Sequence, residues 1–111
     1  MMPFCTNLVA VFTFVQVNVA AVVEEIVYRG LLLTSLTKWV ATPTALLLSS
    51  VAFGLLHVGA QRFDLNVFPP HFFFGLFTGA VYLYSRNLCA PILLHSVYNS
   101  AMFVYFLVII S

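Results

Sequence analysis

Charged residues divide this 111-residue chain into four long apolar stretches. Lys, Arg, Asp and Glu occur only at Glu24, Glu25, Arg29, Lys38, Arg62, Asp64 and Arg86. The uncharged stretches between them cover residues 1–23, 39–61, 65–85 and 87–111. A helix needs about 20 apolar residues to cross the roughly 30 Å hydrocarbon core of a bilayer. The pattern therefore predicts an all-α, polytopic transmembrane bundle with about four membrane-embedded helices.

Prolines, glycines and polar clusters set the expected ends of these helices. The pattern predicts helices at about 4–36, 43–58, 71–85 and 91–111. Pro43 and Pro91 suit the first turn of a helix, where a missing N–H group is tolerated. Gly59 is expected to end the second helix, and the segment AQRFDLNVFPP is expected to form a water-exposed loop.

Composition agrees with an integral, multi-pass membrane protein. Hydrophobic residues make up 63% of the chain and charged residues 6%, against roughly 45–50% and 25% in globular proteins. The net charge of +1 provides no basic patch for nucleic acid. Cys5 and Cys89 have no CxxC spacing and are read as packing residues.

The alternation of helices and loops also predicts a membrane topology. Threading the four helices back and forth places Lys38 and Arg86 at one membrane face, and Arg62 with Asp64 at the other. Positive charges concentrate on cytoplasmic loops of membrane proteins, which favours the Lys38 face as cytoplasmic.

Three charged residues are placed within an otherwise apolar helix, in the segment AAVVEEIVYRGLLL. Each charge costs about 2.5–3.5 kcal/mol at the centre of a bilayer unless it is paired or hydrated. Glu25 and Arg29 are four residues apart and acid-first, so they can form a helix-internal ion pair. Glu24 points about 100° away from that pair. The spare carboxylate of Glu24 is the candidate general base that takes a proton from water.

Two further apolar helices carry polar groups at interior depth. His57 follows Phe53 by four residues, so the imidazole lies one turn from an aromatic ring on the same helix face. His95 and Asn99 are also four apart and can together donate two hydrogen bonds to a developing oxyanion. Hydrolysis of an amide requires a base, a polarising group and oxyanion donors from separate directions, which these helices together can provide.

A second interpretation of the same residues is a metal centre. Two imidazoles and a carboxylate with an open position form a hydrolytic zinc set, so Glu24, His57 and His95 can be read as ligands of a divalent metal such as zinc. The helix-encoded HExxH motif is absent, and spacing alone does not decide between the two readings. No cofactor is therefore assigned. His71, at the junction of the predicted loop and third helix, is expected at most to line substrate access.

The three motif segments resemble those of a known family. In order, EEIVYRG, FGLLH and PILLHSVYN resemble the EExxxR, FxxxH and HxxxN motifs of the CPBP family, which contains CAAX prenyl proteases and bacteriocin-processing (Abi-type) enzymes. The resemblance covers about residues 23–102. It implies an all-helical intramembrane endopeptidase related to the Ras-converting CAAX endoprotease, acting on membrane-associated or prenylated proteins within the lipid bilayer.

The resemblance also implies roles for individual residues. The residue matching Glu24 would activate water together with the one matching His57, while His95 and Asn99 would form the oxyanion site. Glu25 and Arg29 match motif positions as supporting residues, and so does Phe53. Family members have been described both as metallo- and as glutamate-type enzymes, so the resemblance leaves the zinc question open.

The chain is expected to be a single protease core over residues 1–111. Family members usually carry further transmembrane helices before the double glutamate, so the expectation includes a fragment that lacks upstream helices. A non-catalytic membrane scaffold or partner-binding subunit is the main alternative function. A piece of an ion-coupled transporter fits less well, because only one helix carries carboxylates.

Overall fold

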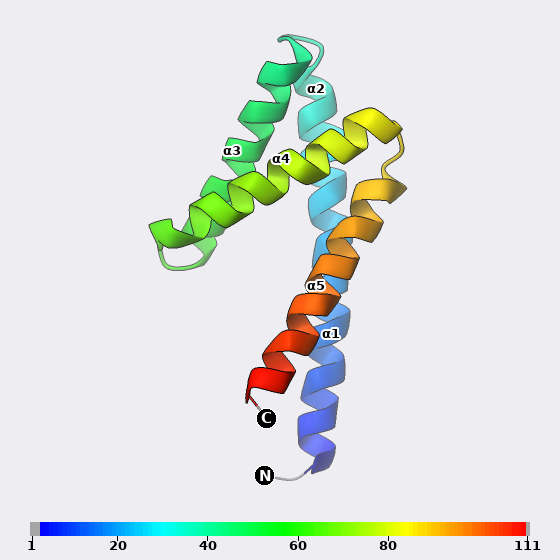
Figure 1. The fold of residues 1–111 in the computed structure, drawn as a ribbon, viewed down its shortest axis with the longest axis vertical. Helices are drawn as coiled ribbons and strands as arrows, with labels where there is room; N and C mark the ends of the chain where they lie inside the picture. Colours follow the sequence, from blue (N-terminus) through cyan, green and yellow to red (C-terminus); the bar gives the residue numbers. More distant parts are fainter. Residues whose placement is uncertain (1–2, 111) are drawn as a thin grey trace.

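The computed structural model describes residues 3–110, and these form helices joined by short turns (Figure 1). The elements are α1 (Pro3–Glu25), the π-helix η1 (Ile26–Leu33), α2 (Thr34–Leu36), α3 (Thr42–Ala60), the 3₁₀ turn η2 (Leu65–Val67), α4 (Phe68–Ser85) and α5 (Cys89–Ile110). The described residues contain no β-strand, which confirms the all-α prediction.

The helices pack as two pairs. α1 packs mainly against α5, and α3 packs mainly against α4. Figure 1 shows α1, η1 and α2 as one long rod, with α5 returning alongside α1 so that both ends of the described chain lie at the same end of the molecule. α4 crosses in front of the rod and also contacts α5. This arrangement brings parts of α1, α3, α4 and α5 around one interior region.

The π-helix η1 follows the double glutamate directly. Its wider turns pair residues five apart, and the hydroxyl of Thr34 likewise donates to the carbonyl of Arg29 at 2.9 Å. The buried residues of η1 are Tyr28, Arg29 and Leu33. One long or broken helix is expected here from the sequence pattern, which contains no sign of a π-helix.

Two helix boundaries differ from the predictions. α3 continues through Gly59 to Ala60, because a helix interior tolerates glycine and the chain turns only at Arg62 and Phe63, whose φ angles are 58° and 59°. α4 begins at Phe68 and includes both prolines of the predicted loop in its first turn. Proline lacks only an N–H group that the first turn leaves unpaired, so the pair starts a helix rather than preventing one.

The last turn and helix follow the prediction closely. Arg86 adopts the left-handed conformation that ends α4. α5 then begins at Cys89, two residues before Pro91, and the side chain of Asn87 accepts a hydrogen bond from the Cys89 N–H at 2.9 Å. The predicted extension of this helix to residue 111 lies outside the described residues.

Three helical segments in the described part of the chain are long and apolar enough to cross a membrane: Cys5–Leu36, Thr42–Ala60 and Cys89–Ile109. α4 is not one of them, although it was predicted from an uncharged stretch; its two prolines, histidine and tyrosines make it less apolar. The protein is an integral membrane protein with several membrane passes.

α4 lies close to its neighbours because it presents small residues to them. Gly75, Thr78 and Gly79 form its buried face. A Cβ atom added at Gly75 would lie 3.3 Å from the Phe53 ring and 3.4 Å from the backbone of Ser50 in α3. The lack of a side chain at this position therefore allows α3 and α4 to cross at short range, and it brings the Gly75 carbonyl next to Arg29.

Candidate active site

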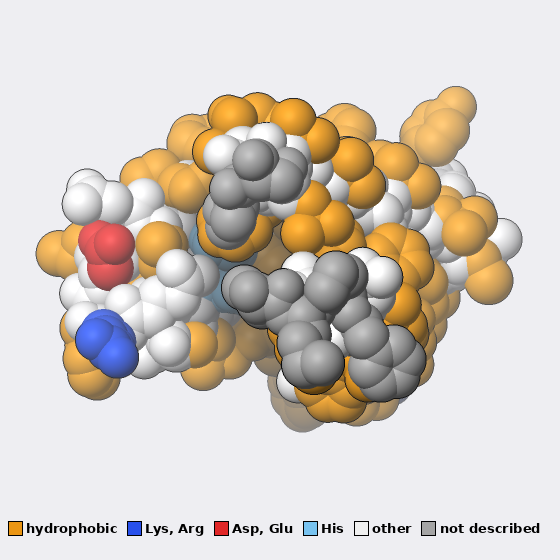
Figure 2. All heavy atoms as spheres, turned by 90° about the horizontal axis from the view of Figure 1, so that it is seen from below, with side chains coloured by type: hydrophobic (Ala, Val, Ile, Leu, Met, Phe, Trp, Pro, Cys, Tyr) orange, Lys and Arg blue, Asp and Glu red, His pale blue; other side chains and the backbone are white. Residues whose placement is uncertain are grey.

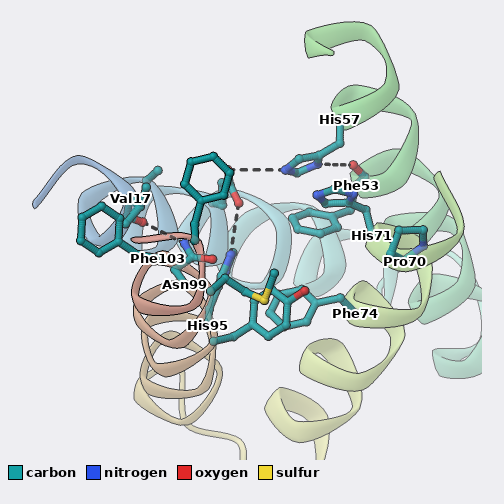
Figure 3. A pocket seen from close by; sticks show the side chains of 14 residues that line it. Val17, Phe53, His57, Pro70, His71, Phe74, His95, Asn99 and Phe103 are labelled. Atoms are coloured by element: carbon teal, nitrogen blue, oxygen red, sulfur yellow. Dashed lines mark hydrogen bonds and ion pairs between the residues drawn. The ribbon is translucent and has the colours of Figure 1, made fainter. Parts of the chain in front are cut away.

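A cavity of about 430 Å³ lies between α1, α3, α4 and α5. Its polar lining comes from all four helices and consists of Glu24, His57, His71, His95 and Asn99. Figure 3 shows the side chains of His57, His71, His95 and Asn99 around one space. The remaining lining is mostly apolar and consists of Val17, Ala20, Phe53, Pro70, Phe74, Tyr98, Met102, Phe103 and Phe106. The structure thus brings together all four residues that the sequence analysis proposed as catalytic.

Glu24 lies between two histidines from different helices. Its Oε1 atom is 3.7 Å from Nε2 of His57, and its Oε2 atom is 3.5 Å from Nε2 of His95. The Glu24 side chain is 30% exposed, whereas Glu25 next to it is fully buried. Separations of 3.5–3.7 Å are longer than a typical N–H···O hydrogen bond, and a water molecule beside each pair can hydrogen bond to both atoms. Glu24 is therefore the carboxylate of the pair that a small molecule in the cavity can reach.

The other nitrogen of each histidine is already bonded. Nδ1 of His57 lies 2.7 Å from the carbonyl oxygen of Phe53, and Nδ1 of His95 lies 2.7 Å from Oε2 of Glu25. Carbonyl and carboxylate oxygens only accept hydrogen bonds, so both Nδ1 atoms donate. Each imidazole is consequently oriented with Nε2 toward Glu24, and this nitrogen is a proton acceptor whenever the ring is neutral.

Glu25 and Arg29 form the buried ion pair that their spacing predicted. Nε of Arg29 lies 3.3 Å from Oε1 of Glu25, and both side chains are almost completely buried. The Arg29 guanidinium also donates to the Gly75 carbonyl at 2.8 Å and to the Thr78 hydroxyl. Because Glu25 also accepts from His95, this cluster joins α1 and η1 to α4 and to α5.

Phe53 fills the space between the ion pair and the cavity. Its ring is 1% exposed, and the Arg29 guanidinium lies 5.0 Å above its centroid. The ring also packs edge-on against Tyr28, with centroids 5.1 Å apart, and lies tilted against the His57 ring, with centroids 4.4 Å apart. Phe53 therefore contacts both the buried Arg29 guanidinium and the His57 imidazole. The contact with His57 is the one that their four-residue spacing predicted.

Asn99 has one of its two amide protons engaged. Nδ2 donates to the carbonyl of Val17 in α1 at 2.9 Å. This bond fixes the carboxamide at the cavity wall and leaves a second N–H group on the same nitrogen. His95, one turn earlier on α5, presents Nε2 to the same cavity. The two expected oxyanion donors are thus the second N–H of Asn99 Nδ2 and Nε2 of His95.

The proposed metal ligands, Glu24, His57 and His95, all line the same cavity. Among the residues that the structure describes, no group of three His, Cys, Asp or Glu side chains is arranged to hold a metal ion. The nitrogens of His57 and His95 instead approach different oxygens of the Glu24 carboxylate. Zinc ligation by these residues stays a prediction, and no chemical step below depends on a metal.

His71 is the cavity residue to which the sequence analysis assigned no chemical role. Its ring stacks on that of His57, with centroids 4.1 Å apart and planes 19° apart. A signal for it was present in the sequence, because residues 71, 74, 75, 78 and 79 share one helical face. The predicted helix at about 71–85 already contained this face, but His71 was considered only as a residue at the loop–helix junction.

The surface around the cavity is strongly apolar. Figure 2 shows the end of the molecule that carries the chain termini, where hydrophobic side chains dominate, charged groups sit at one edge, and histidine is visible inside a hollow. Many large hydrophobic side chains of α1 and α5 are exposed in the described chain, as expected for helices in lipid. The polar cavity therefore opens within an apolar exterior.

Comparison with known proteins agrees with the motifs and the geometry. No curated protein and no solved structure matches the chain. A family described as type II CAAX prenyl endopeptidase Rce1-like matches residues 6–101, which is most of the chain and includes all three motifs. This is a family of integral membrane proteases. The chain therefore belongs to the Rce1-like family of type II CAAX prenyl endopeptidases.

Proposed function

We propose that this protein is an intramembrane endopeptidase that hydrolyses a peptide bond near the C-terminus of prenylated CAAX proteins, using water activated by Glu24 and His57. The observation that carries the proposal is the convergence of Glu24, His57, His95 and Asn99 from three helices on one cavity. Family membership supports the same reaction class.

Water activation is the first step. A water molecule on the cavity side of Glu24 and His57 can donate one hydrogen bond to Oε1 of Glu24 and one to Nε2 of His57, because these two atoms are 3.7 Å apart. Glu24 takes one proton from this water, and the oxygen attacks the carbonyl carbon of the scissile peptide bond. Because Nδ1 of His57 donates to the Phe53 carbonyl, Nε2 of the neutral ring is free to accept a hydrogen bond from the water.

The attack produces a tetrahedral intermediate with a negatively charged oxygen. The free N–H of Asn99 donates to this oxyanion, and so does Nε2 of His95 when that ring carries both protons. The buried Glu25 carboxylate, 2.7 Å from Nδ1, balances the charge of the doubly protonated His95. Collapse of the intermediate breaks the C–N bond, and the proton on Glu24 passes to the leaving amine.

The cavity wall supports a lipid-modified substrate. One side of the cavity is formed by apolar residues of α1 and α5, namely Val17, Ala20, Met102, Phe103 and Phe106. An isoprenoid chain buried there gains roughly 25 cal/mol for each Å² of apolar surface removed from water. Glu24, His95 and Asn99 lie on the same two helices, so a prenylated cysteine and the adjacent peptide bond would occupy neighbouring parts of one cavity.

The direct test is Glu24→Gln in the full chain purified in detergent, assayed with a fluorescence-quenched farnesylated peptide that ends in a CAAX sequence. We expect kcat to fall by about 10²–10⁴-fold, because glutamine cannot accept the proton. The control is Asp64→Asn, the same change at an exposed loop residue. Equal cleavage by wild type and Glu24→Gln would refute the proposed base.

The same assay separates the two alternatives. A non-catalytic scaffold would show no cleavage by the wild type, while Glu24→Gln would leave its abundance and cellular phenotype intact. Zinc ligation by Glu24, His57 and His95 predicts that a chelator abolishes cleavage and that added zinc restores it. Under the glutamate mechanism the chelated wild type keeps its activity.

A further inference from the structure

His71 contacts the proposed water-activating pair but belongs to none of the three motifs. The chain has only three histidines, and all of them line the same cavity. His57 and His95 face Glu24 directly. His71 instead lies flat against His57, with ring centroids 4.1 Å apart and planes 19° apart. Figure 3 shows the two rings side by side, projecting from α3 and α4.

The His71 ring is itself held in place. Its Nδ1 donates to the carbonyl of Val67 at 2.7 Å, one turn earlier, in the same way that Nδ1 of His57 donates to Phe53. Each imidazole is thus anchored to the start or interior of its own helix, and the two anchored rings meet across the α3–α4 interface. Phe53 in α3 also contacts the His57 ring, with centroids 4.4 Å apart, but the two planes are tilted by 53°. Without His71, this tilted ring would be the aromatic neighbour that His57 keeps.

The orientation of the His57 ring matters because its Nε2 atom is too far from Glu24 for a direct hydrogen bond. Nε2 is 3.7 Å from Oε1 of Glu24, so a bridging water must satisfy both atoms at once. The bond to Phe53 fixes the position of Nδ1 but leaves the ring free to rotate about that contact. A flat surface against the ring face removes this freedom and keeps Nε2 directed at Glu24.

We propose that His71 is a positioning residue for the peptidase reaction, whose stacked ring fixes the plane of the His57 imidazole toward Glu24. This inference rests on the proposed function and adds to it a residue outside the motifs. His71 does not touch the reacting atoms in this assignment. Its contribution is geometric, and misplacement of a catalytic group by about 1 Å can reduce a rate by about 100-fold.

The kinetic test compares His71→Ala with His71→Phe in the full chain, using the farnesylated CAAX peptide. We expect His71→Ala to lower kcat by about tenfold to a hundredfold with little change in KM. The variant should still bind substrate, but His57 should activate water less effectively. His71→Phe keeps a flat ring and should recover most of kcat. Phe73→Ala is the matched control, since Phe73 is 64% exposed two residues away.

An NMR measurement tests the stacking without any activity. Histidine labelled at Cε1 gives three resonances in the wild type and two in each His71 variant. A ring stacked on His57 shields its Cε1 proton, so this resonance should move downfield in His71→Ala and remain near its wild-type position in His71→Phe.

The two readouts distinguish the possible failures. Full kcat in His71→Ala, or a His57 resonance that does not respond, would overturn the positioning role while leaving the peptidase proposal intact. If the wild type does not cleave the farnesylated peptide but the expected NMR shifts are seen, the proposed function is refuted instead. Equal loss of kcat in His71→Ala and His71→Phe would also overturn the proposal, because it would require the imidazole itself rather than a flat ring.

Discussion

Glu24 and Glu25 are adjacent in the chain but have different surroundings. Glu25 is completely buried and is held between Arg29 and His95, at 3.3 and 2.7 Å. Glu24 borders the cavity and has only the two longer contacts to Nε2 of His57 and His95. A carboxylate in the first setting stabilises the helices and orients a histidine, whereas one in the second can exchange protons with water.

Removal of the Glu25 charge should therefore affect both stability and activity. We expect Glu25→Gln to lower the free energy of unfolding by about 3–5 kcal/mol, because Arg29 is left as an uncompensated buried charge. It should also lower kcat, since His95 loses the carboxylate at Nδ1. Thermal unfolding in detergent and peptide cleavage measure the two effects.

The double variant Glu25→Gln with Arg29→Met separates these effects. Removal of both charges should restore much of the lost stability but none of the lost kcat. Glu24→Gln, in contrast, should unfold close to the wild type, because its carboxylate makes no short contact. If Glu25→Gln alone unfolds like the wild type, the buried pair does not hold the helices together.

At the level of elements, the crossing of α3 and α4 determines whether the site can form. The crossing depends on Gly75, whose carbonyl also accepts from Arg29. Its added Cβ would meet the buried Phe53 ring and the α3 backbone at 3.3–3.4 Å. The same residue thus controls how closely α3 and α4 approach and where the guanidinium lies.

Gly75→Val should destabilise the fold by about 1–3 kcal/mol, because extra atoms in a packed interface force the helices apart. Cleavage should fall as well, since Phe53 and His57 move with α3. Gly59→Val is the matched control, because a Cβ at Gly59 meets nothing within 4 Å. Similar unfolding curves for the two variants would show that the close crossing is unimportant.

The sequence pattern predicted most of the helices and several of their ends correctly. Uncharged stretches identified four long helices, and prolines in first turns located the starts of α3 and α5 to within about two residues. The ion pair of Glu25 and Arg29 also followed from spacing alone. The π-helix did not, because its five-residue pairing depends on how α3 and α4 pack against η1.

For the whole molecule, the threading of the helices places Lys38 and Arg86 at one end. A pocket at this end is lined by Thr37, Thr42 and Arg86, so the turn that contains Lys38 lies next to the end of α4. Arg62 and Asp64 lie in the connection between α3 and α4 at the other end of α3. The helix order thus agrees with the predicted grouping of the loop charges.

This arrangement predicts one-sided labelling of the two cysteines, which are both exposed and unpaired. Cys89 begins α5 beside the Arg86 turn, whereas Cys5 lies near the opposite end of the rod. In intact cells, a membrane-impermeant maleimide should label Cys5 and spare Cys89, because the positive-inside rule makes the Lys38 face cytoplasmic. Permeabilised cells should show both labelled.

Single variants Cys5→Ser and Cys89→Ser assign each signal. Labelling of Cys89 alone in intact cells would reverse the predicted orientation but keep the helix order. Labelling of both cysteines in sealed cells would contradict the threading itself.

The sequence by itself determined that the chain is helical, membrane-embedded and equipped with Glu24, His57, His95 and Asn99. Hydrophobic length and helical spacing are local properties, so they can be read without a fold. Only the tertiary structure decided that Glu24 faces both histidines, that Glu25 orients His95, and that His71 stacks on His57. Those relations depend on how close α1, α3, α4 and α5 approach, which is set by packing between residues distant in the chain.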